Sequence, residues 1–223
     1  MKIGVEYIGS EREPLVMIDD FAADPDALRS IAITARFGPA AHHYPGIRAD
    51  LPADYPPVQV PIIADVLRDV FGQPGAVEVI DASYSIVTTQ PEDLSVNQRL
   101  PHCDAFDRGR IALVHYLSPD GGDGTAFFRH RSTGFETVDR SRAVIYTGQL
   151  DAELRHGGPP PMSYVAADTP LFERTMLAEA RYNRALIYRS YALHSGAISR
   201  GASLSPDPET GRLTITGFLS IGG

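Results

Sequence analysis

Residues 110–117 of the chain are Arg-Ile-Ala-Leu-Val-His-Tyr-Leu, and residues 118–124 are Ser-Pro-Asp-Gly-Gly-Asp-Gly. A short apolar run that is rich in β-branched and aromatic residues is typical of a buried strand. The Gly- and Asp-rich stretch after it is typical of a tight turn and lacks the spacing of an EF-hand calcium loop. We therefore predict a strand over residues 110–117 that ends in a hairpin turn.

Similar short segments lie on both sides of this strand, separated by residues that favour turns. They cover residues 77–87, 125–129, 142–147, 185–190 and 212–219. One helix is expected to interrupt the series, because Thr169-Pro170 is a helix start and Leu171, Phe172, Met176 and Leu177 form an apolar face. Many short strands with regular turns predict a β-sandwich or barrel.

Residues 1–75 have a mainly helical pattern after a short strand or two. Asp24-Pro25 places a capping aspartate before a proline at the first helical position, and a second helix is expected after Pro56-Pro57. The stretch 42–48 has neither a helical nor a strand period. Because no linker divides the chain, we predict one α+β domain over residues 1–223 that is mainly β. Its helices, within residues 1–75, pack on the outside of a β core formed by residues 76–223.

Composition excludes several classes of function. The 223 residues include 20 Lys and Arg against 28 Asp and Glu, which gives a formal net charge of −8. An acidic chain is a poor match for nucleic acid, because phosphate binding needs clustered cations. The single cysteine, Cys103, excludes an intrachain disulfide and a Cys-rich zinc site. No run approaches the roughly 18 apolar residues of a membrane span, and the first residues do not form a signal peptide, so we expect a cytoplasmic protein.

The segment His102-Cys103-Asp104 contains the pattern His-x-Asp. On an extended chain, residues i and i+2 point to the same side, so His102 and Asp104 can bind one metal ion while Cys103 points away. Two histidines and one carboxylate leave open positions for oxygen chemistry on non-haem Fe(II). The best candidate for the second histidine is His194, which follows the apolar strand 185–190. The alternative for His194 is a strand-end histidine that binds no metal.

Arg212 is a candidate anchor for an anionic ligand. Strand alternation places Arg212, Thr214 and Thr216 on one face, and an arginine beside hydroxyl groups can bind a carboxylate through two hydrogen bonds. A surface ion pair is the alternative role for Arg212, and Arg200 is an alternative anchor. Arg99, Arg108 and Arg110 add positive charge near the His-x-Asp segment. These three either attract an anionic substrate or balance nearby acidic groups such as Asp107.

Taken in order, these motifs resemble the Fe(II)/2-oxoglutarate-dependent oxygenases, and among them the prolyl-4-hydroxylase-like branch. The motifs are His102-x-Asp104, Leu113–Leu117, Gly121-Gly122 with residues 125–128, Asn183–Tyr188 leading to His194, and Arg212. The resemblance covers roughly residues 80–220 and implies a double-stranded β-helix, the jelly roll of cupin-like proteins. It also implies a catalytic metal triad of His102, Asp104 and His194. Arg212, Thr214 or Thr216, and Tyr116 would then bind 2-oxoglutarate.

The activity implied by the resemblance is hydroxylation of a small molecule or a protein side chain, with Fe(II), 2-oxoglutarate and O2. Two alternatives remain at this point. One is a jelly-roll module that binds a ligand without turnover, and the other is a cupin-type metal-dependent isomerase or hydrolase. The remaining histidines have plainer interpretations. We expect His115 to be a packing residue, His42-His43 to lie in a solvated loop or beside the substrate, and His130 and His156 to be exposed.

Overall fold

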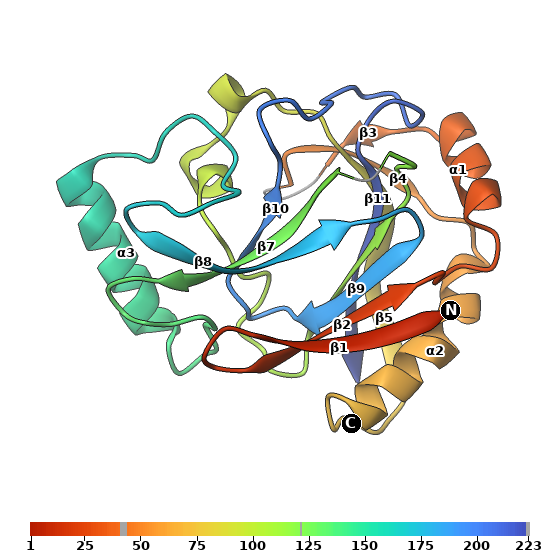
Figure 1. The fold of residues 1–223 in the computed structure, drawn as a ribbon, viewed down its shortest axis with the longest axis horizontal. Helices are drawn as coiled ribbons and strands as arrows, with labels where there is room; N and C mark the ends of the chain where they lie inside the picture. Colours follow the sequence, from red (N-terminus) through yellow and green to blue (C-terminus); the bar gives the residue numbers. More distant parts are fainter. Residues whose placement is uncertain (41–43, 121, 222–223) are drawn as a thin grey trace.

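The computed structural model describes residues 1–40, 44–120 and 122–221, and this part of the chain is mainly β with antiparallel pairing. The strands are β1 (Lys2–Ile8), β2 (Glu13–Asp19), β3 (Gly38–Pro39), β4 (Gly46–Asp50), β5 (Val77–Val87), β6 (Ile111–Tyr116), β7 (Gly122–His130), β8 (Phe172–Ala180), β9 (Arg184–Arg189), β10 (His194–Ala197) and β11 (Leu213–Ile221). An eight-stranded sheet has the order β1-β2-β9-β6-β11-β5-β4-β3, and a three-stranded sheet has the order β10-β7-β8 (Figure 1).

Three α-helices accompany the sheets, namely α1 (Pro25–Thr34), α2 (Tyr55–Asp69) and α3 (Ala143–Gly157), with two short 3-10 turns at Pro91–Asp93 and Val96–Arg99. Both expected helices are present, although α2 begins at Tyr55, so the Pro56-Pro57 pair lies in its first turn instead of before it. Asp24 Oδ1 caps α1 by accepting from Ala27 N at 2.9 Å. In Figure 1, α1 and α2 lie on one side of the molecule and α3 lies on the other. None of the helices in the described ranges is long and apolar enough to cross a membrane.

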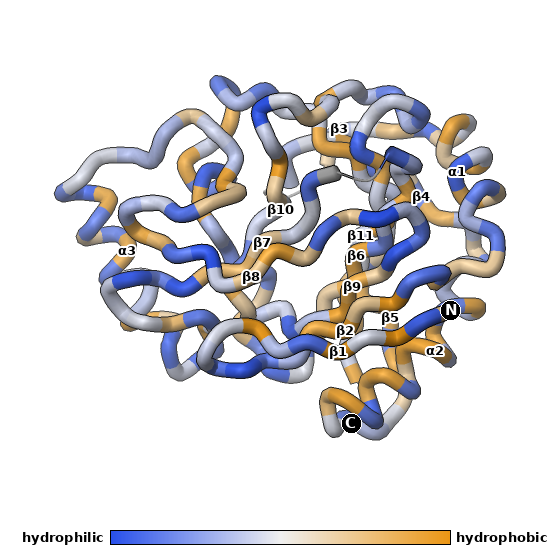
Figure 2. The backbone as a smooth tube through the Cα atoms, viewed as in Figure 1, coloured by the Kyte–Doolittle hydropathy of each residue, from blue (hydrophilic) through white to orange (hydrophobic). Residues whose placement is uncertain are grey.

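The large sheet has two different faces because side chains alternate along each strand. Leu113 of β6 and Ile215 of β11 pack with α1 and α2 in a first hydrophobic core. Ala112, Tyr116 and their neighbours on the other face pack against Phe127 of the small sheet in a second core. Figure 2 shows hydrophobic segments gathered around β2 and α2. The second face, which looks toward the small sheet, is the one that carries the candidate site.

The predicted strand at residues 142–147 is wrong, because these residues begin α3. Asp139 starts the turn that leads into the helix by accepting backbone hydrogen bonds from the next residues through Oδ1. Tyr146, Leu150 and Leu154 then recur every fourth residue and pack in a third core. The β-branched residues of the segment face solvent, so their strand propensity does not determine the structure.

The predicted helix that opens at Thr169-Pro170 is also wrong, because residues 172–180 form β8. Thr169 accepts from Phe172 N through Oγ1 at 3.0 Å, and the two backbones pair as well, which makes a turn rather than a helix cap. Apolar residues at 172 and 176 fit both a helical and a strand period. Pairing of β8 with β7 along its whole length selects the strand.

The first third of the chain contributes four strands as well as two helices. β1 and β2 extend the large sheet at one edge, and β4 forms where an irregular stretch was expected, pairing with β5. Gly46 makes this pairing possible, because a Cβ there would lie 2.0 Å from the carbonyl oxygen of Ile86. His42 and His43 lie outside the described residues.

Candidate metal centre

The three predicted metal ligands come together at one end of the small sheet. His102 and Asp104 precede β6, and His194 is the first residue of β10. The backbones of His102 and His194 exchange two hydrogen bonds, from His102 N to His194 O at 2.9 Å and back at 2.8 Å. Two histidines far apart in sequence are therefore held side by side by the main chain.

The ligand atoms face one another at distances that suit a shared ion. Nε2 of His102 lies 3.6 Å from Oδ1 of Asp104, and Nε2 of His194 lies 3.5 Å from Oδ2 of the same carboxylate. One ligand atom from each of the three residues falls within 4.8 Å of the others. Within the described ranges, no second group of three such side chains meets this geometry.

The donor set fits a divalent transition metal, and the ring orientation of His194 supports this. Its Nδ1 donates to the carbonyl oxygen of Ala192 at 2.9 Å, which leaves the Nε2 lone pair directed toward Asp104. The side chain of His194 is 7% exposed, whereas that of His102 is 52% exposed. The centre is therefore anchored on its buried side and accessible on the side of His102.

The surroundings of the centre hold Asp104 and shield His194. Asp104 N donates to the carbonyl oxygen of Ser190 at 2.8 Å. The ring of Tyr188 packs edge-on against His194 with centroids 5.0 Å apart. Burial, together with the nearby Asp104 carboxylate, raises the pKa of Tyr188 well above 10, so its phenol stays protonated. Tyr188 was not among the predicted site residues, although strand alternation from Arg184 places it on the inner face.

Cys103 points away from the metal ligands, as its position between them predicted. It packs with the third core, beside Leu100 and Phe128. Burial is the main cause that raises the pKa of its thiol to about 12. Cys103 therefore remains a protonated thiol and behaves as a small apolar residue.

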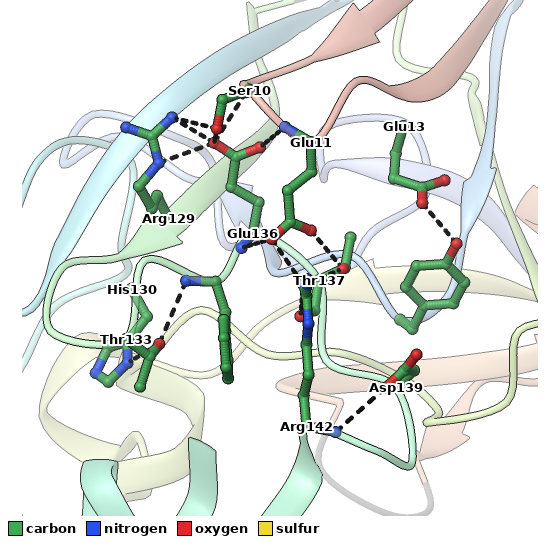
Figure 3. A network of polar contacts seen from close by, with 12 residues as sticks. Ser10, Glu11, Glu13, Arg129, His130, Thr133, Glu136, Thr137, Asp139 and Arg142 are labelled. Carbon is green, nitrogen blue, oxygen red and sulfur yellow. Dashed lines mark hydrogen bonds and ion pairs between the residues drawn. The ribbon is translucent and has the colours of Figure 1, made fainter. Parts of the chain in front are cut away.

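The segment before His194 is held by a residue of a polar network. Figure 3 shows this network, in which Glu136 lies between Arg129 and the chain at Ser10 and Glu11. Leu193 N donates to the backbone oxygen of Glu136 at 2.8 Å. The Glu136 carboxylate, itself buried, accepts from Ser10 N at 3.0 Å and from Glu11 N at 2.9 Å, and it pairs with Arg129. The turn between β1 and β2 thereby supports the chain that positions His194.

Arg212 lies on the inner side of the sheets, just before β11. Its Nη2 donates to the carbonyl oxygen of Gly124 at 2.8 Å, and its Cζ lies 5.6 Å from the centre of the Tyr116 ring. Phe127, three residues beyond Gly124 on β7, pairs with His194. Three residues of strand span about 10 Å, so Arg212 contacts β7 about 10 Å along the strand from the residue that pairs with His194.

Polar side chains line the space beside Arg212. The hydroxyl of Tyr116 hydrogen-bonds that of Thr125 at 2.7 Å, and Thr214 Oγ1 donates to Ser85 O at 3.2 Å. The hydroxyl of Tyr44 is buried and has no hydrogen-bond partner among the described residues. Burial raises the pKa of Tyr44 and that of Tyr116, with the positive charge of Arg212 opposing the shift in both, so these are protonated donors.

Arg200, the rival anchor, has a different environment. It is exposed, and it lies on the wall of a cavity of about 450 Å³ with Tyr164 and Ile198. None of the three metal ligands lines this cavity. Arg212 is therefore the arginine whose contacts lie on the same inner face as the metal centre.

Fold and site together define an antiparallel β protein with a centre of two histidines and one carboxylate. The model of a family described as a family of unknown function (DUF6445) matches residues 1–219, so the chain belongs to this family. A search of curated proteins found no match.

Several solved structures show a distant similarity to the chain. AviO1 from Streptomyces viridochromogenes Tue57 is 13% identical over 98% of this chain and 88% of its own, with a TM-score of 0.45. HygX from Streptomyces hygroscopicus with iron bound is 14% identical over 93% and 82%, with a TM-score of 0.41. An N-substituted L-amino acid dioxygenase from Burkholderia ambifaria AMMD, in complex with alpha-KG, is 12% identical over 96% and 84%, with a TM-score of 0.41.

Proposed function

We propose that this protein is an Fe(II)- and 2-oxoglutarate-dependent oxygenase of the prolyl-4-hydroxylase-like branch that hydroxylates a small molecule or a protein side chain. The observation that carries the proposal is the convergence of His102, Asp104 and His194 on one ion-sized position. Two imidazoles and one carboxylate on one side of a metal are the ligand set of non-haem Fe(II) oxygenases, with positions left for the co-substrate and O2. The two facing antiparallel sheets are those expected of a double-stranded β-helix.

The proposed 2-oxoglutarate site consists of Arg212, Tyr116 and Thr214. Arg212 would bind the distal carboxylate through its planar guanidinium, as the geometry of this group favours. The Tyr116 hydroxyl, held by Thr125 and kept protonated by burial, would donate a further hydrogen bond. Arg200 is not preferred, because it is exposed and lies on the wall of a cavity that none of the three proposed metal ligands lines.

When bound, Fe(II) with 2-oxoglutarate and O2 would supply an oxidant for C–H bonds, with release of succinate and carbon dioxide. The chain itself contributes position and exclusion of water. Ala192 fixes the ring of His194 so that Nε2 faces the ion, and the backbone pairing with His194 places His102 beside it. Tyr188 and Phe127 pack around His194 and exclude solvent from the inner side.

We further propose that residues 1–223 form one domain and that it works in the cytoplasm. The single domain is supported by β1 to β4, which belong to the same sheet as β5, β6, β9 and β11. The cytoplasmic location is a prediction from the sequence.

The test is succinate formation by protein purified without oxygen and then supplied with Fe(II), 2-oxoglutarate and air. The wild type should form succinate slowly without an added substrate. His102→Ala and Arg212→Ala should abolish this, and His156→Ala, a change at an exposed position of α3, should not.

The other outcomes separate the alternatives. Tight Fe(II) binding without 2-oxoglutarate binding would contradict the proposal and indicate a cupin-type isomerase or hydrolase. Failure to bind any metal would indicate a binding module without turnover.

A further inference from the structure

Of the three arginines that flank the His-x-Asp segment, two have partners in the protein. Arg99 donates to the carbonyl oxygen of Leu94 from Nε at 2.8 Å and from Nη2 at 2.5 Å. Arg108 pairs with Asp139, with Nε 2.8 Å from Oδ2. Arg110 differs, because its guanidinium forms no ion pair or hydrogen bond with the described residues, and its Nε is buried. Of the three arginines, Arg108 is neutralised by a carboxylate, Arg99 is held by a neutral carbonyl group, and Arg110 is the one whose guanidinium has no partner among the described residues.

Arg110 lies close to the metal centre through the main chain. Its carbonyl oxygen accepts from Ser190 N at 3.0 Å, and the carbonyl oxygen of Ser190 accepts from Asp104 N at 2.8 Å. Only Ser190 therefore stands between Arg110 and a metal ligand in this chain of hydrogen bonds.

The side chain of Arg110 lies on the inner face of the large sheet. Alternation gives residue 110 the same face as Ala112 and Tyr116, which belong to the second core. The Cζ atom lies 5.2 Å from the centre of the Phe218 ring, and Phe218 packs against the same core. The guanidinium is therefore held over an aromatic ring, which stabilises a cation without using its hydrogen-bond donors.

A second polar group beside Arg110 also lacks a partner. Ser190 is fully buried, and its Oγ forms no hydrogen bond within the part of the chain that the structure describes. An unsatisfied buried donor costs about 1–3 kcal/mol, and more when it is charged. A carboxylate would satisfy both groups at once, because it accepts hydrogen bonds from a guanidinium and from a hydroxyl.

This position is separate from the proposed 2-oxoglutarate site. Arg110 and Tyr116 stand at opposite ends of β6, which six residues of strand place about 20 Å apart. The residue of β9 next to the metal centre, Tyr188, pairs with Ala112 between them. The centre therefore has Arg212 on one side and Arg110 on the other.

We propose that Arg110 binds a carboxylate group of the substrate, with Ser190 as a second donor, and that the rest of the substrate extends from Phe218 toward the metal. A planar carboxylate matches the guanidinium fork, and the aromatic ring below keeps the fork in one orientation. That the bound carboxylate belongs to a substrate rests on the proposed function. The anion site itself can be tested without turnover.

The test uses benzoate as the probe and benzamide as its neutral counterpart, with protein saturated with Zn(II) and 2-oxoglutarate so that no reaction occurs and Arg212 is occupied. Binding is followed by the NMR resonance of the arginine Nε–H groups and by calorimetry. Wild type should bind benzoate at least tenfold more tightly than benzamide. Arg110→Gln should bind benzoate at least tenfold more weakly than wild type and lose this preference.

Two further variants keep the result interpretable. Arg155→Gln removes the same charge from an exposed position of α3 and should bind benzoate within twofold of wild type. Arg110→Lys keeps the charge and loses the fork, so three- to tenfold weaker binding is expected, and it provides the test if Arg110→Gln does not fold. Benzoate affinity within twofold of wild type in the folded Arg110 variants would overturn the proposal.

The same titration repeated without metal and 2-oxoglutarate separates this proposal from the oxygenase. Arg110-dependent benzoate binding in a protein that never forms succinate would leave the anion site standing and reject the proposed function. Succinate formation together with benzoate binding that is unchanged in the Arg110 variants would support the proposed function and reject the anion site.

Discussion

Two buried histidines of this protein, His194 and His115, differ in how their ring nitrogens are used. His115 Nδ1 contacts the Tyr55 hydroxyl at 3.1 Å, and its Nε2 contacts Asn183 Oδ1 at 2.9 Å. Because Asn183 Nδ2 donates to the carbonyl oxygen of Ala22, Oδ1 must be the acceptor, so Nε2 of His115 carries the proton. We call His115, Tyr55 and Asn183 the His115 node.

At the candidate metal centre, Nδ1 is the one nitrogen of His194 with a hydrogen-bond partner among the described residues, and Nε2 faces the Asp104 carboxylate at 3.5 Å. His130 follows the pattern of His115, with Thr133 at 2.9 Å and Glu153 at 2.8 Å. All three histidines are buried, so burial alone does not distinguish a ligand from a structural residue. The three histidines differ in how many ring nitrogens have a hydrogen-bond partner in the protein, which is two for His115 and His130 and one for His194.

Removal of the His194 ring, and with it Nε2, should have the strongest effect, which is a loss of Fe(II) affinity. Changing an outer partner of a metal ligand costs 10–100-fold in affinity, so loss of the ligand itself in His194→Ala should weaken Fe(II) binding by more than about 100-fold. His115→Gln should leave metal affinity within threefold. Competition with a chelator measures both. Similar Fe(II) affinities in His194→Ala and wild type would mean that His194 is not a ligand.

The Glu136 network offers the next largest effect and acts on stability rather than metal affinity. Arg129 pairs with two carboxylates, the buried Glu136 and Glu173, whose side chain is 43% exposed. Removing the buried partner in Glu136→Ala leaves the backbone amides of Ser10 and Glu11 without their acceptor and leaves Arg129 with the half-exposed Glu173 alone, which should cost about 3 kcal/mol. Glu173→Ala should cost less than about 1 kcal/mol.

Urea unfolding of both variants measures the difference. Equal losses would show that the two ion pairs have the same weight and that burial of Glu136 has no special role.

Acid pH should weaken the His115 node. Burial lowers the pKa of His115 to about 4 from its ordinary value of 6.5. As the pH falls, the unfolded chain therefore takes up this proton before the folded one. The contribution to stability is complete above pH 6.5 and is lost between pH 6.5 and 4, about 3 kcal/mol in all.

The matched variant is His115→Gln, which can keep both contacts and does not titrate. Its stability should change little between pH 6.5 and about 4.5, above the range in which the carboxylates with lowered pKa, such as Asp19 and Glu136, begin to bind protons. A wild-type curve that is flat over this interval would contradict the assigned protonation of His115.

These contrasts also show what sequence alone could predict. The pair His102 and Asp104 depends only on local extended backbone, and the expected packing role of His115 is confirmed. His130 was expected to be exposed and is fully buried. The error has a physical cause, because its partner Glu153 belongs to α3 and the ring that covers it, Phe172, belongs to β8.

Both of those elements were predicted with the wrong type. The local propensities of both segments were ambiguous, and long-range contacts determine their secondary structure. β8 pairs with β7, and one face of α3 packs in the third core. Arg110 is a further case. Sequence placed it in a basic group with Arg99 and Arg108, and only the contacts of the other two show that Arg110 is the arginine without a partner.

The smallest expected effect compares two buried tyrosine hydroxyls. Tyr116 belongs to the proposed 2-oxoglutarate site and Tyr55 to the His115 node. Tyr116→Phe removes one hydrogen bond to the bound co-substrate, worth about 1 kcal/mol, so KM for 2-oxoglutarate should rise about fivefold while kcat changes less than twofold.

Tyr55→Phe removes a hydroxyl of the same kind from a site that meets no ligand. It leaves Nδ1 of His115 without its donor, so it should lower the free energy of unfolding by about 1–2 kcal/mol and leave KM unchanged. The pair of variants thus separates binding from stability with one chemical change. A rise in KM of the same size in both would mean that the tyrosines act through the fold, and Tyr116 would then lose its assigned contact with 2-oxoglutarate.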